Sequence, residues 1–437
     1  MSKDSPGYSS AMATLELPPL VRRLRPHLLD TRSVWLVGGA VRDQLLGREV
    51  KDVDLTVPEG ALALGSELAR ALEAGFVPLD EERGCARVVL PDDRGIVDIT
   101  DFRGPTLEAD LEHRDFTVNA LAAPLDPPHE IVDPLGGLGD LSRRRLRAPA
   151  PAVFSDDPLR GLRGVRLAAE LRFRLGAETR RWIRRFASRL SEGGGGGIRD
   201  ELFRTLLTPN PGRAVRSLRD LRLLPVSLPE LEPAAGGSKR LGRWDRAERE
   251  ILTGRAEIPP DLTEAVVERL EATIASGRPR RGLVRMAVLL EGSGRSSLES
   301  ALERLRFGRK EIAWSRRFLA GLPSLRELEE RWTDLEIHRF YRRSQGAGVE
   351  TALVAHFLDG LPREELLRLL DARFRRREQI VDPDPLVTGR DLTSILQIPP
   401  GPRIGELLER LREARVTGEV ETREQALDLA RHMLATA

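Results

Sequence analysis

The stretch from Ser33 to Val57, SVWLVGGAVRDQLLGREVKDVDLTV, constrains the fold more than any other part of this chain. It opens with an apolar run at residues 34–37 that predicts a buried strand, and residues 40–46 predict a short helix. Gly38 and Gly39 lie between the two. A glycine pair lets the backbone approach a ligand closely, and the helix N-terminus behind it favours an anion such as phosphate.

A second strand is predicted at residues 52–57, where polar and apolar residues alternate as DVDLTV. Residues two apart share one face of a strand, so Asp52 and Asp54 project together. Two carboxylates on one face repel each other unless a cation lies between them, and their hard oxygen atoms suit Mg²⁺. The two strands together predict a phosphate cradle facing a magnesium site.

The sequence GGAVRD at residues 38–43, followed by DVD at residues 52–54, resembles a known signature. It is similar to the head domain of class II tRNA nucleotidyltransferases and bacterial poly(A) polymerases, a branch of the polymerase-β-like nucleotidyltransferase superfamily. The resemblance implies an α+β fold, in which a small mixed sheet with helices forms the head and an all-helical neck, body and tail follow. It also implies that Gly38, Gly39 and Arg42 hold the triphosphate of a nucleotide.

Composition sets broader limits. A chain of 437 residues exceeds one ordinary core, and no segment is apolar over the length needed to span a bilayer. Residues 1–14 lack a charged-then-apolar signal pattern, so we expect a disordered lead-in and a cytoplasmic protein. The single cysteine, Cys85, excludes an internal disulfide framework and any multi-cysteine zinc site.

A third acidic candidate lies in a predicted hairpin. Residues 86–90 and 95–99 predict its two strands, with the turn at residues 92–95, and Asp98 lies inside the second strand. Two-metal phosphoryl transfer needs ligands for both ions and a base or metal-bound hydroxyl for the attacking oxygen. The resemblance places the family's third acidic residue at Asp98, which would join Asp52 and Asp54 as a catalytic group.

Residues 111–121, LEHRDFTVNAL, resemble the family's RRDFTxNA segment, with His113 in place of the first arginine. Arg114 can hold a phosphate or fix another acidic side chain. Asp115 and Asn119 stand four apart on a predicted helix and can reach the ribose hydroxyls together. All three residues are therefore candidates for nucleotide binding.

A later helix, for which Ser155 is the predicted N-cap, carries a row of charges. Asp157, Arg160 and Arg163 are spaced by three and line one face, with Arg166 slightly off it. The row resembles the family's EDxxRxxR element, in which an aspartate and an arginine read the Watson–Crick edge of the incoming base. A guanidinium donates and a carboxylate accepts, so the pair can complement cytosine or adenine.

The remaining motifs are weaker. DPLGGLGD at residues 133–140 resembles the turn that links head to neck, and glycines at 193–197 replace the Glu-Arg pair of a family neck segment, which predicts a poorly held helix start. Glu291 stands where some relatives carry a His-Asp phosphohydrolase motif, so we expect no such activity. In the tail-like segment from residue 384, a helical apolar stripe is predicted at Ile404, Leu407, Leu408 and Leu411.

We therefore expect a lead-in at residues 1–14, a catalytic head at 15–140, a base-recognising neck at 141–215, and an RNA-binding body at 216–383 and tail at 384–437. The resemblance implies an enzyme that adds the 3′-terminal C, C and possibly A to tRNA from CTP and ATP. It would use Mg²⁺ and no nucleic-acid template, and it would release pyrophosphate. The helical domains would bind the acceptor and T arms by shape and phosphate contacts, without a membrane.

Other functions stay open at this point. A small-molecule nucleotidyltransferase could share the glycine pair and the two aspartates, but it would not need Asp157, Arg160 or a long helical body. A non-catalytic RNA-binding relative would be expected to have lost one of the carboxylates. Poly(A) polymerase is closer, because the catalytic motifs are shared.

The range of nucleotides added also stays open. Only RGPTLEADLEHR separates Phe102 from Asp115, and this segment is much shorter than in relatives that complete CCA. In the family it carries a flexible loop, and enzymes that add only CC resemble the shortened form. Pro105 and a predicted helix at residues 107–113 leave little slack, although the glycines at 193–197 could give the neck some freedom. A CC-adding enzyme with a separate A-adding partner is therefore an alternative.

Overall fold

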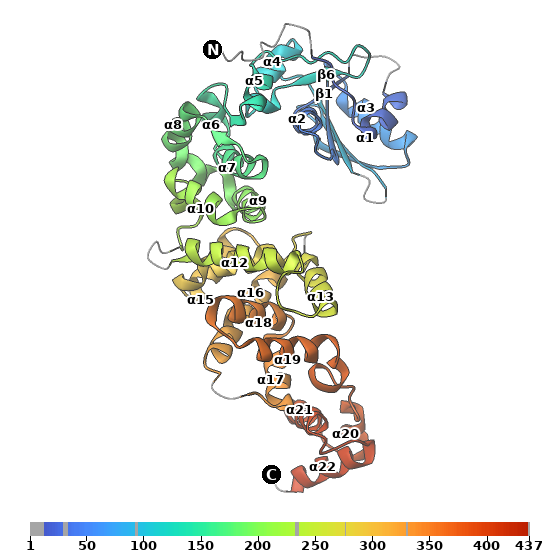
Figure 1. The fold of residues 1–437 in the computed structure, drawn as a ribbon. Helices are drawn as coiled ribbons and strands as arrows, with labels where there is room; N and C mark the ends of the chain where they lie inside the picture. Colours follow the sequence, from blue (N-terminus) through green and yellow to red (C-terminus); the bar gives the residue numbers. More distant parts are fainter. Residues whose placement is uncertain are drawn as a thin grey trace. The chain divides into compact units, whose positions relative to one another are not determined.

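The computed structural model describes residues 13–28, 34–91, 95–231, 236–275, 277–328 and 331–435. The chain divides into two compact units: unit 1 comprises residues 1–193 with 221–223, and unit 2 comprises residues 194–220 with 224–437 (Figure 1). Nearly all of the predicted lead-in, and residues 92–94 of the predicted hairpin turn, lie outside the described ranges. The finer division into head, neck, body and tail stays a prediction.

Unit 1 contains a mixed sheet, and its described strands run in the order β3-β4-β5-β2-β1-β6. Their bounds are β1 (Trp35–Val37), β2 (Asp52–Val57), β3 (Gly75–Asp80), β4 (Cys85–Val89), β5 (Ile96–Asp101) and β6 (Ala122–Pro124). Strand β2 pairs in parallel with β5, and every other neighbouring pair is antiparallel. The strand predictions in 34–57 and the hairpin prediction are confirmed, whereas β3 and β6 were not predicted.

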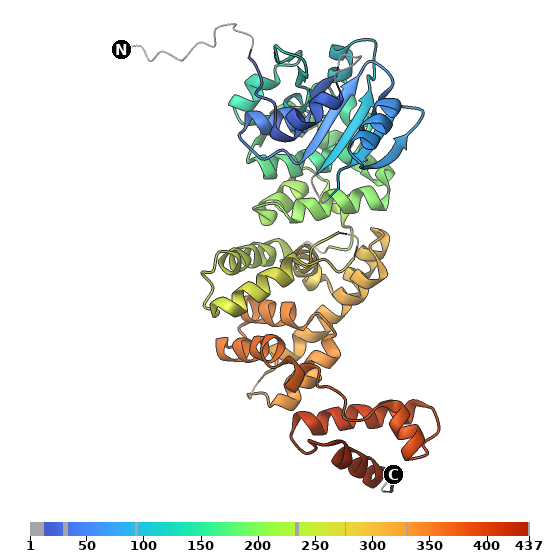
Figure 2. The same ribbon diagram turned by 90° about the vertical axis from the view of Figure 1, so that its right-hand side faces the viewer.

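Helices cover both sides of this sheet. Helix α2 (Gly39–Leu45) lies on one side of the strands (Figure 1). Helices α1 (Pro19–Leu24) and α3 (Ala61–Ala71) lie on the other side, and that side faces the viewer in Figure 2. Val53, Leu55 and Val57 are fully buried, as the alternation in β2 predicts. The opposite face of β2 therefore carries the two aspartates.

Helix α4 (Leu107–Glu112) lies between β5 and β6 in the chain, and four helices follow the sheet: α5 (Gly137–Ser142), α6 (Ala152–Asp156), α7 (Leu159–Leu171) and α8 (Ala177–Phe186). The DPLGGLGD turn builds α5, because Asp133 accepts from the N–H groups of Gly137 at 2.6 Å and Leu138 at 2.9 Å. Asp140 is fully buried and accepts from Thr117 Oγ1 at 2.7 Å and from Arg147 Nε at 2.8 Å. This turn therefore ties α5 to the segment that carries the predicted nucleotide-binding residues.

Two local predictions in unit 1 were wrong. Residues 115–119 form only a 3-10 turn at Thr117–Asn119, because the extended Phe116 is drawn into the core, where it lies 6.5 Å from the Phe154 ring. Ser155 lies inside α6 and does not cap the charged helix α7. Pro158 disfavours helical geometry in the residue before it, so Asp157 is extended, with φ −142° and ψ 97°, and separates the two helices.

Unit 2 is helical. Its helices are α9 (Gly194–Leu206), α10 (Pro211–Asp220), α11 (Leu224–Ser227), α12 (Gly237–Leu252), α13 (Pro260–Glu271), α14 (Arg280–Leu290), α15 (Arg295–Arg304), α16 (Arg309–Arg326), α17 (Asp334–Ser344), α18 (Gly348–Asp359), α19 (Arg363–Phe374), α20 (Gly389–Ile395), α21 (Pro402–Val416) and α22 (Arg423–Ala435). No helix in the described ranges is both long and apolar enough to cross a membrane.

The glycine tract differs from its prediction, because residues 194–197 form the first turn of α9. A Cβ atom on Gly195 would lie 2.3 Å from the carbonyl oxygen of Arg304, so only glycine allows α9 to pack this closely on the end of α15. Arg199, one turn later, donates to the carbonyl oxygen of Arg306 at 2.6 Å. Packing against α15 therefore holds a helix start that glycine alone would leave loose.

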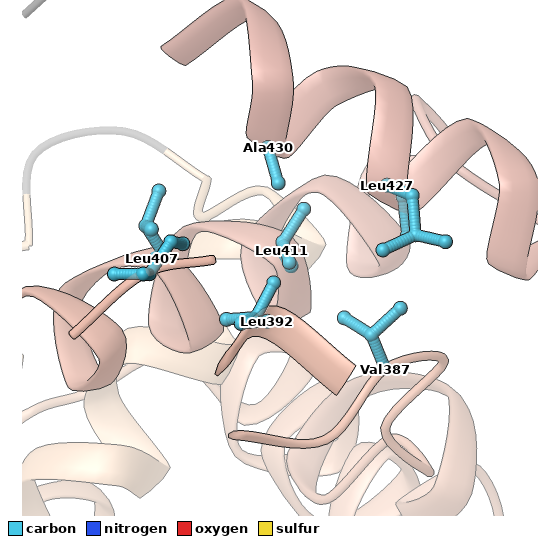
Figure 3. Packing of buried hydrophobic residues seen from close by; sticks show 8 residues of the cluster. Val387, Leu392, Leu407, Leu411, Leu427 and Ala430 are labelled. Atoms are coloured by element: carbon cyan, nitrogen blue, oxygen red, sulfur yellow. The ribbon is translucent and has the colours of Figure 1, made fainter. Parts of the chain in front are cut away.

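Residues 387–430 share a small core of their own, in which α20, α21 and α22 meet (Figure 3). Leu407 and Leu411 are buried in it, and Ile404 and Leu408 pack against its edge. The predicted apolar stripe is therefore confirmed. Glu291, at the end of α14, accepts from Arg240 Nε at 2.6 Å and is engaged in an ion pair rather than free.

Candidate active site

Gly38 is the point at which three predicted elements meet. Its φ of +73° favours glycine, and its N–H donates to the carbonyl oxygen of Leu121 at 3.2 Å. A Cβ atom there would lie 3.1 Å from Nη1 of Arg114 and 3.3 Å from Oδ2 of Asp54. The glycine turn, one carboxylate of β2 and the guanidinium of Arg114 therefore converge on one small region.

The carboxylates of this region lie on adjacent parallel strands. Asp54 of β2 is directly opposite Asp98 of β5, and Asp52, two residues earlier, lies on the same face of β2. Burial raises the pKa of Asp54, the charge of Arg114 opposes the rise, and the negative charges of Asp98 and Asp52 add to it. A cation at this face would relieve that repulsion.

Asp98 has a partner that the sequence analysis did not identify. Arg87, directly opposite it on β4, donates from Nε to Oδ1 at 2.7 Å and from Nη2 to Oδ2 at 2.8 Å. Within the described ranges, no three acidic, histidine or cysteine side chains gather closely enough to hold a metal ion. Asp52 and Asp54 are the two carboxylates on this face of β2, and the cation site predicted there stays a prediction.

The other predicted nucleotide-binding residues form a connected network. Arg42 of α2 donates from Nη1 to Oδ1 of Asn119 at 2.5 Å, and Asn119 donates to Asp115 at 2.9 Å. Asp115 then accepts from Nε of Arg163 on α7 at 2.5 Å. The structure thus brings all four residues together, but Asp115 and Asn119 bind each other and their arginines.

The electrostatics of Asp115 explain why this network is stable. Burial alone would raise the pKa of the Asp115 carboxyl, but the charge of Arg163 and the hydrogen bonds from Asn119 and Arg163 outweigh burial and lower it. Asp115 is therefore an ionised, buried side chain held by both α7 and the 3-10 turn. It fixes α7 to the glycine turn through Asn119 and Arg42.

The charged row of α7 separates into different roles. Asp157 accepts from the N–H of Leu159 at 3.0 Å, and its other oxygen lies 3.7 Å from Nε of Arg160. Arg160 is close to the same region, since Nη2 reaches the carbonyl oxygen of His113 at 3.5 Å. Arg166 is buried and bound to Glu170 at 2.9 Å. Asp157 and Arg160 therefore remain a donor–acceptor pair near the site, while Arg166 is engaged in a pair of its own.

Asp110 is a second residue that the sequence analysis missed. It is buried in α4, accepts from the backbone N–H of Arg103 at 3.1 Å and accepts from Nη2 of Arg114 at 3.1 Å. The short segment between Phe102 and Asp115 is therefore closed on itself and bound to Arg114. The four-residue spacing of Asp110 and Arg114 on a predicted helix was the available signal.

Three stretches match models of known families. Residues 34–147 match the poly A polymerase head domain, residues 172–235 match the RNA and SrmB-binding site of polymerase A, and residues 286–430 match the tRNA nucleotidyltransferase domain 2. Together these matches cover both the sheet and most of the helical unit.

Full-length relatives are similar to this chain. The CC-adding tRNA nucleotidyltransferase of Geobacter sulfurreducens is 35% identical over 436 residues, which cover 96% of each chain. The CC-adding tRNA nucleotidyltransferase of Synechocystis sp. is 33% identical and covers 91% of this chain and 93% of its own. The A-adding tRNA nucleotidyltransferase of Deinococcus radiodurans is 32% identical, with 90% of this chain and 93% of its own covered.

Solved structures agree in fold. A CCA-adding enzyme in complex with CTP has a TM-score of 0.68 at 24% identity and covers 95% of this chain and 96% of its own. The Thermotoga maritima CCA-adding enzyme with tRNA has a TM-score of 0.63 at 23% identity, over 97% of this chain and all of its own. The predicted α+β head with a helical remainder is confirmed, and the chain belongs to the tRNA nucleotidyltransferase and poly(A) polymerase family of nucleotidyltransferases.

Proposed function

We propose that this protein adds two cytidylates, and no adenylate, to the 3′ end of tRNA from CTP without a nucleic-acid template. The observation that carries the proposal is the shortness of the segment between Phe102 and Asp115, and Asp110 additionally closes this segment by holding Arg103 and Arg114. Two of the similar full-length relatives described above are CC-adding enzymes. In the reaction, the tRNA 3′-oxygen bonds to the α-phosphorus of CTP while the bond to the leaving pyrophosphate breaks.

The glycine turn would bind the triphosphate. The N–H groups of Gly39 and Ala40 begin α2, where the helix N-terminus favours negative charge. The guanidinium of Arg42 lies 3.4 Å from the position of a Cβ on Gly39, and Arg114 reaches Gly38 from the other side. Both arginines are already oriented by carboxylate or amide partners, so they would need little reordering to meet the phosphates.

Asp52 and Asp54 would hold the divalent metal ion that this family of nucleotidyltransferases generally uses, and we assign it as Mg²⁺. Mg²⁺ typically takes one or two carboxylates together with substrate phosphates, and the pair on β2 fits that requirement. Burial raises the pKa of Asp54, and the negative charges of Asp98 and Asp52 raise it further, so a cation bound here would relieve the repulsion among these carboxylates. When bound, the ion would neutralise charge that develops on the transferring phosphoryl group.

The base would be read by Asp157 and Arg160, which offer an acceptor and a donor about one helical turn from Arg163. Arg163 and Asp115 would position α7 rather than touch the base, because they bind each other at 2.5 Å. Asn119 and Arg42 continue the same connection to the glycine turn. A rigid link of this kind suits a pocket that accepts one base only.

Restriction to cytidine follows from the same rigidity. Cytosine and adenine differ in size and in the geometry of their Watson–Crick edges, so one Asp–Arg pair must be reoriented to serve both. A mobile loop could supply that reorientation, but here Thr106 caps α4 and Asp110 closes the segment. The glycine tract at 194–197 is helical and packed in unit 2, so it does not supply the freedom that its composition suggested.

The helical unit would bind tRNA, the partner seen with the Thermotoga enzyme, and we place the protein with its tRNA in the cytoplasm. The head, neck, body and tail at residues 15–140, 141–215, 216–383 and 384–437 would divide catalysis, base reading and RNA binding as the sequence suggests. ATP would then be a nucleotide that this enzyme does not incorporate.

The test is product sequencing. Purified protein is supplied with a tRNA transcript that ends at the discriminator base, together with CTP and ATP, and the 3′ ends are sequenced. Products that end in CC, with ATP unused, are expected. Terminal A addition would contradict the restriction to cytidine, and long A tails would indicate a poly(A) polymerase. The Asp54→Ala protein, purified in parallel, controls for contaminating host enzymes.

A further inference from the structure

A basic pocket of about 190 Å³ opens in unit 2, far along the chain from the glycine turn. It lies where the ends of α13, α17 and α19, the start of α18 and the π-helical turn at Arg377–Val381 meet. We call it the arginine pocket, and its lining includes Arg269, Tyr341, Arg342, Gly348, Arg373 and Arg377.

Arg373 is the least compensated side chain of the arginine pocket. It is half-buried, and no described residue forms a hydrogen bond or ion pair with its guanidinium. Burial, followed by the positive charges of Arg269 and Arg377, lowers the pKa of Arg373, while Tyr341 and Glu350 oppose that effect more weakly. Like charges are thus held together at partial desolvation, which is unfavourable unless an anion joins them.

The neighbouring arginines leave this excess charge in place. Arg269 pairs with the carboxylate of Glu350, with Nε 3.1 Å from Oε1 and Nη2 3.1 Å from Oε2, and it shares that carboxylate with Arg280, whose Nη1 lies 3.7 Å from Oε1. Of the other lining arginines, Arg342 pairs with Glu409 at 2.8 Å, and Arg377 pairs at 3.2 Å with Asp382, which itself lines the pocket. The carboxylates are therefore fewer than the guanidinium groups around them.

The backbone adds to the positive field. Helix α18 starts at Gly348, which lines the pocket, so the positive end of the helix dipole lies beside it. A Cβ atom on Gly348 would lie 2.7 Å from the Tyr341 ring, so glycine is needed for α18 to approach α17 this closely. Burial raises the pKa of Tyr341, which keeps the phenol neutral, and its hydroxyl donates to the carbonyl oxygen of Leu369 at 2.7 Å.

We propose that the arginine pocket binds a single phosphate group, held by Arg373 with Arg269 and Arg377. The volume is several times the roughly 30 Å³ that one water molecule occupies in the liquid, so a tetrahedral phosphate with some bound water fits. Guanidinium groups match phosphate geometry and give strong, charge-assisted hydrogen bonds. The phosphate could come from a tRNA backbone, which rests on the proposed function, or from free phosphate or pyrophosphate.

The experiment uses the full-length protein and four forms of it: wild type, Arg373→Gln, Arg373→Lys and the control Arg343→Gln. Arg343 is exposed on α17, next to the lining residue Arg342, but does not line the pocket, so its loss removes the same charge close to the pocket without removing a lining side chain. tRNA lacking its CCA end is titrated at several salt concentrations. For Arg373→Gln we expect binding about tenfold weaker and a salt slope lower by about 1, with Arg373→Lys closer to wild type.

A phosphate map then identifies the source. In tRNA carrying randomly ethylated phosphates, ethylation at one or two adjacent positions should weaken binding to wild type and to Arg343→Gln, but no longer matter for Arg373→Gln. In a separate titration, inorganic phosphate and pyrophosphate are added to the same proteins. If Arg373→Gln loses phosphate or pyrophosphate binding but binds tRNA as wild type does, the pocket is still a phosphate site, and its ligand is a free anion.

Two results would overturn the site. Equal tRNA binding, salt slope and anion binding in wild type and Arg373→Gln would do so, and so would equal losses in Arg373→Gln and Arg343→Gln, which indicate a general charge effect. Measuring nucleotide addition at saturating tRNA distinguishes a failure of the phosphate site from a failure of the proposed function. A wild type that adds no nucleotide contradicts the function, whereas normal addition with an inert pocket contradicts only the phosphate site.

Discussion

Arg87 holds both carboxylate oxygens of Asp98 across the ladder between β4 and β5, with Nε 2.7 Å from Oδ1 and Nη2 2.8 Å from Oδ2. The two residues are direct partners in the antiparallel register. The hydrogen bond to Asp98 raises the pKa of Arg87, so the guanidinium stays charged. A bidentate pair of this kind fixes the orientation of the carboxylate beside Asp54.

Replacing Arg87 by Gln should therefore lower CTP incorporation by about 10–100-fold, the usual effect of losing a partner that orients a metal-site carboxylate. Arg87→Lys keeps the charge but loses the bidentate contact, so its CTP incorporation should lie between that of wild type and that of Arg87→Gln. The measurement is kcat and KM for CTP over a range of Mg²⁺ concentrations. Arg83→Gln, at an exposed arginine before the same strand, is the control. An unchanged kcat at every Mg²⁺ concentration would show that the pair is only structural.

Asp52→Ala and Asp54→Ala should each reduce single-turnover incorporation by at least about a thousandfold, because metal-facing carboxylates are worth several kcal/mol in phosphoryl transfer. Folding and tRNA binding should persist, since Asp52 is exposed and the charge of Asp54 is not stabilised by its surroundings. Glu49→Ala, an exposed acidic residue before the same strand, should be neutral. Near-normal single-turnover rates in either aspartate variant would refute the metal assignment.

Asp157→Asn and Arg160→Gln should weaken the preference for CTP over UTP more than they slow correct addition. Loss of one good bidentate contact is worth about 1–3 kcal/mol of discrimination. Asn is chosen because Asp157 also accepts from the N–H of Leu159, and an amide oxygen keeps that contact. Competition between CTP and UTP measures the effect, with the exposed neighbour Asp156→Asn as control. Variants that lose rate but keep full preference would make Arg160 a phosphate contact.

Much of unit 1 was predictable because its signals are local. The apolar run at β1, the glycine pair and the alternation in β2 each depend on neighbours in sequence, and all three elements form where expected. The convergence of Gly38, Asp54 and Arg114 was implied by the family resemblance. Its close geometry, within 3.1 to 3.3 Å of a Cβ on Gly38, emerges only when β1, β2 and the segment after α4 are placed together.

Two of the wrong predictions share one cause, which is packing between distant segments. Phe116 leaves the expected helix because its ring fits against Phe154, and the glycine start of α9 is held by α15 rather than by its own propensity. Arg87 could have been found by counting the hairpin register from the predicted turn, which places it opposite Asp98. The pairing of Asp115 with Arg163 could not have been found in this way, because the two residues are 48 positions apart and nothing local links them.

Replacing Arg163 by Gln should destabilise the attachment of residues 115–121 to α7, most strongly at neutral pH. Breaking a buried pair typically costs about 3–5 kcal/mol, and the partial exposure of Arg163 places this case at or below the lower end. The fold lowers the pKa of Asp115 below its ordinary 3.8, so this stability is present above that pH and is lost as pH falls through the folded pKa.

In Arg163→Gln, burial is no longer outweighed, so the pKa of Asp115 should rise and the carboxyl should protonate at a higher pH. The difference between wild type and variant should therefore be largest near pH 7 and shrink on acidification. Hydrogen exchange in peptides that cover residues 115–125, compared at matched pH, measures it. Arg180→Gln, an exposed arginine on α8, is the control. A difference that grows as the pH falls would contradict the ionised Asp115.

Asp110→Asn tests whether the closed segment acts in nucleotide addition. The carboxylate of Asp110 holds the backbone N–H of Arg103 and the guanidinium of Arg114, and hydrogen bonds to charged groups are worth about 1.5–3 kcal/mol. An amide oxygen can still accept one of these bonds, but it no longer neutralises Arg114. We expect KM for CTP to rise about tenfold, because Arg114 would be displaced from the glycine turn.

Faster hydrogen exchange at residues 103–114 should accompany this rise in KM. ATP should remain unused, because a twelve-residue segment is too short to act as a lever even when it is loosened. Glu108→Gln, on the exposed face of the same helix, should leave both readings unchanged. Efficient A addition by Asp110→Asn would show that closure of the segment, rather than its length, excludes adenosine.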